Sequence, residues 1–313
     1  MVDVPRSFRV HDIHLAVEDA DIGTGKPARP AGTGPRRPLL AGPPHTLTPC
    51  PRQETPRVYD PVKTRKAVLA QFGHVREAVG GLSAERLAAP TRLGEWTVRD
   101  LAAHITMAVE SVPRALARPE PPKAELNPLD YASVTAAHAA AIAEGSHGLA
   151  ETNPDLVALY AGVEQRITEA LAATPPGRII DTRAGGMLLD DYLLTRTIEL
   201  VVHTDDLNAA VPGLDVPYDR HALATCVRLL ADTLAARAPG GSTEVRIPPY
   251  AVVQCVEGPR HTRGTPPNVV ETDPLTWIRL ATGRVEWAAA LDAAKVSASG
   301  ERADLSGLLP LMR

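Results

Sequence analysis

Residues 196–207 read RTIELVVHTDDL, and this stretch decides the fold because it places polar groups on an otherwise apolar helix. A helix turns once every ~3.6 residues, so Glu199 and His203, which are four residues apart, project from the same face. The three residues between them are Leu, Val and Val, which places the pair where helices bury hydrocarbon. A carboxylate is costly in such a place unless something pairs with it. The stretch therefore predicts a core helix with two candidate metal ligands.

A second apolar helix supplies a third candidate ligand. Residues 96–105 read WTVRDLAAHI, and His104 falls on the apolar stripe of this helix. Two imidazoles and one carboxylate leave the fourth position of a tetrahedral zinc ion open, which is typical of a catalytic site. Nickel and iron also accept these ligands. The alternative is ordinary, because Glu–His pairs of this spacing are commonly solvated and a lone core histidine is commonly satisfied by a hydrogen bond.

Asp206 lies three residues beyond His203 on the same helix face. A carboxylate there can orient a ligating imidazole. The alternative for Asp206, and for Asp205 beside it, is a charge at a helix end. We expect five other histidines to lie outside the site: His11, His14, His45, His138 and His147.

Composition excludes several classes of protein. The chain has 313 residues, enough for two domains, and a formal net charge of -4. We expect no nucleic-acid partner, because no basic stripe with interleaved aromatic residues occurs. Cys50, Cys226 and Cys255 are odd in number and widely separated, which favours a reducing cytoplasm over a disulfide framework. We expect no membrane span and no signal peptide, since no apolar run is long enough for either.

Residues 1–58 differ from the rest of the chain. Residues 23–56 are rich in Pro, Gly and Arg and cannot bury enough hydrocarbon to offset their ordering entropy. We expect a disordered extension there, interpreted either as the product of a misplaced start codon or as a regulatory tail.

Four helical regions follow and predict a four-helix bundle over residues 59–211. The first begins at Asp60-Pro61 and ends at Gly80-Gly81. The second begins at Thr97, which forms a capping box with Asp100. A long region over residues 130–173 is expected to break at residues 145–148 or 153–154, and the last helix spans residues 188–210. We expect no strand between residues 60 and 200.

Residues 212–217 read PGLDVP and predict a linker to a second domain over residues 218–313. An amphipathic helix over residues 221–236 comes first. Strands are predicted at residues 245–247, 251–256, 268–272 and 295–299, and further helices at residues 274–282 and 285–290. This pattern predicts a small α+β domain.

The bundle carries a family resemblance. Residues 93–104, LGEWTVRDLAAH, and the pattern Glu199-x-x-x-His203-x-x-Asp206 resemble motifs of the mycothiol-dependent maleylpyruvate isomerase family, whose bundles are DinB-like and bind metal. The resemblance spans about residues 59–211 and implies that His104, Glu199 and His203 are metal ligands.

Two stretches of the second domain resemble bacterial sterol-carrier-like domains. They are residues 276–283, TWIRLATG, and residues 294–311, AKVSASGERADLSGLLPL. This resemblance implies an apolar cavity, for which Trp277, Trp287 and Leu308 are candidate lining residues. Filling an ordinary core is the alternative for all three.

Two functions remain open on these observations. The first resemblance implies a metal-dependent enzyme that holds mycothiol, or a similar thiol, as a metal-bound thiolate and transfers it to a small electrophile or isomerises that electrophile. The second implies a non-catalytic carrier of a lipid or another apolar ligand, with a metal-binding bundle. Metal-dependent hydrolysis is a third possibility, with Asp206 as its candidate general base.

Overall fold

The computed structural model describes residues 57–130, 139–258 and 266–312. The expected disorder of residues 1–58 falls almost wholly outside this part, as do His11, His14, His45 and His138. Residues 56–313 cluster into one compact unit. The division of this unit into domains at residues 211 and 218 stays a prediction.

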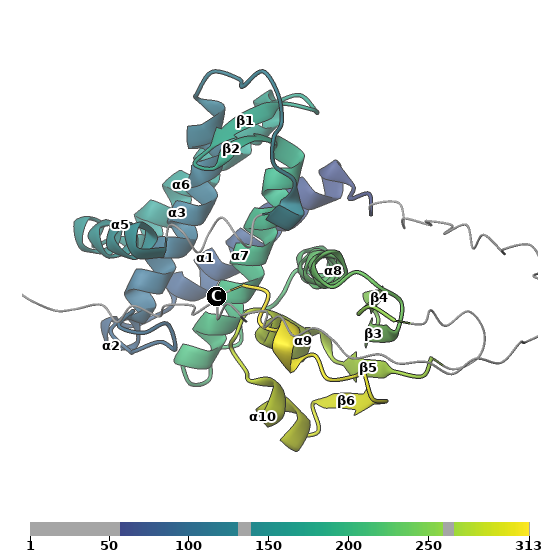
Figure 1. Cartoon of the computed structure of the whole chain (residues 1–313). Helices are drawn as coiled ribbons and strands as arrows, with labels where there is room; N and C mark the ends of the chain where they lie inside the picture. Colours follow the sequence, from purple (N-terminus) through teal and green to yellow (C-terminus); the bar gives the residue numbers. More distant parts are fainter. Residues whose placement is uncertain (1–56, 131–138, 259–265, 313) are drawn as a thin grey trace, which may run out of the picture. The chain divides into compact units, whose positions relative to one another are not determined.

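Four long helices form the bundle that the sequence predicts (Figure 1). They are α1 (Pro61–Gly80), α3 (Val98–Leu116), α6 (Leu156–Ala173) and α7 (Leu189–Ala210). Asp60 caps α1 by accepting hydrogen bonds from the backbone of Val62 and Lys63, with Pro61 in the first turn. The expected break falls before α6, because Asp155 caps that helix. Three shorter helices complete this part: α2 (Ala84–Leu87), η1 (Pro128–Asp130) and α5 (Ala139–Thr152).

A small hairpin between α6 and α7 corrects one expectation. Strands β1 (Ile179–Thr182) and β2 (Gly185–Leu188) pair antiparallel, so the expectation of no strand before residue 200 was wrong. The strands have four residues each and no clear alternation, which hides them from pattern analysis. The backbone N–H groups of Glu125 and Leu126 also donate to the carbonyl of Gly186, so the hairpin holds the segment that leads to η1.

The second half is an α+β unit, and the predicted fold class is confirmed. Helix α8 (Arg220–Arg237) packs on a four-stranded sheet of order β4-β3-β5-β6, in which only the β3–β5 pair is parallel. The strands are β3 (Thr243–Ile247), β4 (Ala251–Cys255), β5 (Val269–Thr272) and β6 (Val296–Ser299). Helices α9 (Pro274–Ala281) and α10 (Trp287–Asp292) and the short η2 (Ser306–Leu308) complete it.

Helix α7 takes part in two apolar cores. Leu193, Leu200 and Leu207 pack with α1, α3 and α6 in the core of the bundle. Ile198 and Val201 belong to a second core that includes α8, the sheet and α9. Helix α7 therefore lies between the other bundle helices and α8 (Figure 1) and is buried along most of its length.

Trp277 fills this second core. Its side chain is 1% exposed, and its indole N–H donates to the carbonyl of Val227.

None of the helices in the described part of the chain combines the length and the apolar character that crossing a bilayer requires.

Candidate metal centre

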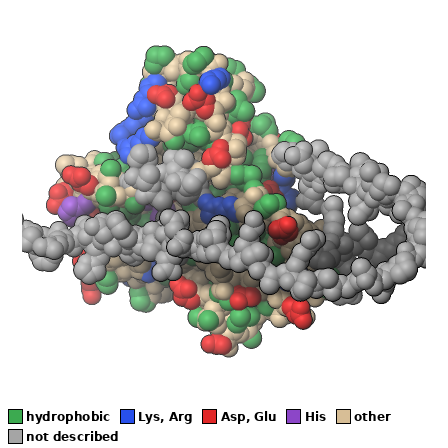
Figure 2. All heavy atoms as spheres, in the orientation of Figure 1, with side chains coloured by type: hydrophobic (Ala, Val, Ile, Leu, Met, Phe, Trp, Pro, Cys, Tyr) green, Lys and Arg blue, Asp and Glu red, His purple; other side chains and the backbone are tan. Residues whose placement is uncertain are grey.

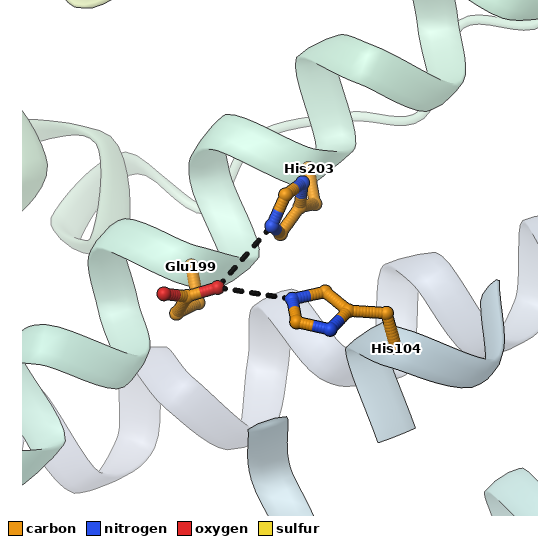
Figure 3. A group of neighbouring side chains, drawn as sticks. All are labelled: His104, Glu199 and His203. Atoms are coloured by element: carbon orange, nitrogen blue, oxygen red, sulfur yellow. Dashed lines mark hydrogen bonds and ion pairs between the residues drawn. The ribbon is translucent and has the colours of Figure 1, made fainter. Parts of the chain in front are cut away.

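The three residues that the sequence singles out meet between α3 and α7 (Figure 3). Their candidate ligand atoms all lie within 4.8 Å of one another. The Glu199 Oε2 atom is 3.3 Å from Nε2 of His104 and 3.2 Å from Nε2 of His203. The arrangement follows from local structure, because the capping box of Thr97 and Asp100 starts α3 nearly two turns before His104.

Hydrogen bonds indicate the tautomer of each imidazole. The Ser146 hydroxyl donates to the carbonyl of Ile142 at 2.7 Å, so it accepts a hydrogen bond from Nδ1 of His104 at 3.2 Å. Nδ1 of His203 donates to Oδ2 of Asp206 at 2.8 Å. Each Nε2 is therefore the nitrogen that faces Glu199, and it would give its lone pair to a bound cation once it carries no proton.

Burial and hydrogen bonding set the charges of the trio. Burial lowers the pKa of the His104 imidazole, so this ring is neutral at neutral pH. Burial raises the pKa of Glu199, but hydrogen bonds with His104 and His203 outweigh burial and hold this pKa well below its ordinary value. Burial also lowers the pKa of His203, but hydrogen bonds to Asp206 and Glu199 raise it to about 9. The metal-free trio thus holds an ionised carboxylate beside one charged and one neutral imidazole.

This donor set fits a divalent metal ion. Nε2 of His104 and Oε2 of Glu199 lie 3.3 Å apart, and a cation between them would be attracted by the carboxylate and by the lone pair of the neutral ring. Ligands held 2.0–2.2 Å from a tetrahedral zinc ion lie about 3.4 Å apart, close to the 3.3 and 3.2 Å that separate Glu199 from the two imidazoles. Metal binding at these three residues stays a proposal, and a proton bridging His203 and Glu199 is the alternative.

Asp206 and Asp205 sit in a buried ionic cluster behind His203. Asp206 is fully buried, and its carboxylate accepts hydrogen bonds from His203, Arg92 and Arg284. Asp205 is 2% exposed and pairs with Arg92 and Arg279. Asp205 is therefore more than a charge at a helix end. Sequence reasoning missed the three arginines and Ser146, because no short spacing connects them to the trio.

A cavity of about 230 Å³ reaches the trio from one side, and His104 and Glu199 form part of its wall. Its lining combines apolar groups such as Met107 and Met187 with several arginines. The guanidinium of Arg196 stacks 4.5 Å from the ring centre of Tyr192 on this wall. The arginine side chains of the lining are Arg114, Arg118, Arg183 and Arg196. Figure 2 shows Lys and Arg side chains gathered near the hairpin end of the bundle.

His147 lies outside the trio, as expected. Its Nδ1 is 3.1 Å from Asp100 and its Nε2 is 3.2 Å from Glu151, and the side chain is 65% exposed.

The fold and the trio together define a helical bundle that carries a candidate metal centre and is joined to a small α+β unit. Residues 68–208 match the family described as mycothiol maleylpyruvate isomerase N-terminal domain. Residues 219–311 match the family described as bacterial SCP ortholog. The chain thus joins a region like the first family to a region like the second, as the resemblances implied.

Solved structures agree with the fold. A crystal structure of the mycothiol-dependent maleylpyruvate isomerase superposes with a TM-score of 0.52 at 17% identity, covering 79% of this chain and 95% of that one. A histidine-to-alanine mutant of that isomerase gives a TM-score of 0.51 at 16% identity, with the same coverage of both chains. At this identity the likeness concerns the fold. No curated protein matches the chain.

Proposed function

We propose that this chain is a metal-dependent transferase or isomerase that uses mycothiol, or a similar small thiol, on a small electrophile. The observation that carries this proposal is the convergence of His104, Glu199 and His203 beside a cavity whose wall includes His104 and Glu199. A bound divalent ion, with zinc favoured, would supply stabilisation of the thiol sulfur as thiolate at neutral pH. The match of residues 68–208 to the isomerase family supports mycothiol as the thiol.

The cavity wall suggests what the other residues do. Arg196 is 6% exposed, and it lies one helical turn before Glu199 on α7. Its guanidinium contributes positive charge beside the trio, which favours ionised Glu199 and an electrophile with a negative group. Met107 and Met187 offer apolar contacts to the rest of the substrate and exclude water.

A cytoplasmic location, inferred from the cysteine content, suits a reduced thiol.

Binding of mycothiol to the full chain tests the proposal. Zinc-loaded protein should bind mycothiol in calorimetry, and protein stripped with a chelator should not. In cobalt-loaded protein, mycothiol should add a sulfur-to-metal charge-transfer band. Glu199→Gln should weaken both metal and thiol binding, because the variant loses a charged ligand. Thiol binding that is indifferent to metal removal would overturn the proposal.

A second cavity favours the carrier function as the alternative. It measures about 590 Å³ and is lined largely by apolar side chains of the α+β unit, among them Leu280, Val285, Trp287 and Leu309. Of the three residues expected to line a cavity, Trp287 does so, whereas Trp277 and Leu308 are not part of this lining.

A fluorescent fatty acid distinguishes the two functions in the full chain. A carrier should bind this probe equally well with Glu199→Gln and with metal removed, and it should show no metal-dependent thiol binding. The enzyme should lose thiol binding in both cases.

A further inference from the structure

The ionic cluster joins the candidate metal centre to the α+β unit. Asp205 and Asp206 belong to α7, whereas Arg279 lies in α9 and Arg284 follows that helix. Arg92 precedes α3 and contacts both carboxylates. Each of the other two arginines contacts one carboxylate: Arg279 pairs with Asp205 and Arg284 pairs with Asp206.

Arg284 holds Asp206 in one orientation. Its Nη2 atom donates to Oδ2 at 2.9 Å and its Nε atom donates to Oδ1 at 3.2 Å, which is a two-point contact. Its Nη1 atom donates to the carbonyl of Thr282 at 2.7 Å, so the guanidinium is itself fixed. The side chain of Arg284 is 16% exposed and that of Asp206 is 0% exposed, so water competes little for this contact.

The oxygen that Arg284 holds is also the one that orients the imidazole of His203. Oδ2 of Asp206 accepts from Nη2 of Arg284 and from Nδ1 of His203, which is 2.8 Å away. A carboxylate that is free to rotate would leave this imidazole free to turn its Nε2 atom away from Glu199. Partners that fix a ligating histidine commonly affect metal affinity about 10–100-fold.

We propose that Arg284 is a positioning residue for the metal centre, acting through Asp206 on His203. The α+β unit then completes the metal centre of the bundle, and the bundle residues alone do not suffice for full metal affinity. This inference rests on the proposed metal site. Arg279 lies on the same unit but contacts Asp205, so it ties α9 to α7 without touching the carboxylate that holds His203.

Zinc affinity of full-length variants tests the proposal, measured by competition with a chromogenic chelator. Arg284→Gln should lower zinc affinity about 10–100-fold. The matched control Arg279→Gln removes the same charge from the same unit and should change zinc affinity less than about threefold, because Asp206 keeps its partners. In cobalt-loaded protein, Arg284→Gln should shift the ligand-field bands and Arg279→Gln should leave them at the wild-type wavelengths.

Conservative variants guard against a folding defect. Arg284→Lys keeps the charge but loses the two-point contact, so it should fall between wild type and Arg284→Gln, while Arg279→Lys should match wild type. If Arg284→Gln does not fold, the lysine pair decides the question. Equal losses at positions 279 and 284, or no loss at 284, would overturn the positioning role and leave the metal site intact. Wild-type protein that binds no metal would overturn the proposed function and this inference together.

Discussion

His203 contacts both the candidate ligand Glu199 and the buried ionic cluster that contains Asp206. One nitrogen of its ring faces Glu199 and the other donates to Asp206. Both carboxylates favour positive charge at this position, whether a proton or a metal ion supplies it. A proton and a metal ion would therefore compete for Nε2 of His203.

Replacing His203 should separate ligation from general stability. Loss of a partner that only orients a ligand is expected to lower zinc affinity about 10–100-fold. His203→Ala removes a candidate ligand itself, so zinc affinity should fall further than that. His147→Ala provides the control, since its exposed ring contacts Asp100 and Glu151 instead. Metal content after dialysis and chelator competition measure the difference. Equal zinc occupancy in the two variants would contradict the assignment of the ligands.

The sequence was informative about the trio and silent about its surroundings. Glu199, His203 and Asp206 repeat at helical spacing, and His104 lies on the stripe of a second helix, so periodicity is enough to propose that they converge. Arg279 and Arg284 lie more than seventy positions from their partners, at 74 and 78 residues. Pairing over such a separation depends on how α8 packs against α7 and α9, and no local pattern encodes it.

Among the elements, α3 depends most visibly on one acidic residue. The Asp100 carboxylate accepts from the backbone N–H and the hydroxyl of Thr97 at 2.9 and 2.6 Å and so starts the helix that presents His104. Burial raises the pKa of Asp100, but the hydrogen bonds from Thr97 outweigh burial, and the net pKa lies below its ordinary value.

Asp100→Asn should lower the free energy of unfolding by about 1 kcal/mol at neutral pH. Because the folded pKa is depressed, this contribution is fully present above the unfolded pKa of about 3.9 and is lost as pH falls through the folded value. Denaturant titrations of wild type and Asp100→Asn should therefore converge at acidic pH. Glu151→Gln is the control, since Glu151 contacts the same His147 but is exposed. A gap between wild type and Asp100→Asn that stays constant into acid would contradict the role of the charge.

The β1–β2 hairpin was not predictable from the sequence, whereas the four bundle helices were. Helices repeat an apolar stripe over many turns, but the hairpin relies on pairing between two four-residue strands and on contacts with residues 121–126. Gly186 allows this contact, because a Cβ atom there would lie 2.3 Å from the carbonyl oxygen of Lys123.

Gly186→Ala should therefore destabilise the protein by about 1–3 kcal/mol, the usual cost of forcing atoms into a packed site. Gly148→Ala is the matched control, because a Cβ atom at Gly148 meets nothing within 4 Å and the residue lies inside α5. That control should be neutral or stabilise by up to about 1 kcal/mol. The midpoints of urea unfolding measure both variants. Equal midpoints would show that residues 121–126 can move away from the added Cβ atom without a loss of stability.

Across residues 57–312, as far as the structure describes them, the linker and the two apolar cores indicate one cooperative unit. Gln71 of α1 accepts from the backbone of Asp219 at 2.7 Å and donates to the carbonyl of Pro217 at 3.2 Å. These contacts fasten the predicted linker to the bundle. The core that contains Ile198 and Val201 of α7 continues through α8 to the sheet.

Thermal unfolding of residues 56–313 should accordingly be a single transition. Helix loss followed by circular dichroism and opening of β3 followed by hydrogen exchange should give the same midpoint. Zinc should move both to higher temperature together, because a ligand that binds only the folded state stabilises all that unfolds with it. Two separate midpoints, with zinc moving only the helical one, would show independent domains.

The shared core of α7 and α8 also bears on any attempt to produce the two halves separately. A fragment that begins at residue 218 would leave bare the side of its own core that Ile198, Val201 and Val202 normally cover. Exposed apolar patches of this kind drive self-association. The guanidinium of Arg279 would lose the buried carboxylate that neutralises it. Poor solubility of such a fragment would thus reflect the missing helix rather than an intrinsic failure of the sheet to fold.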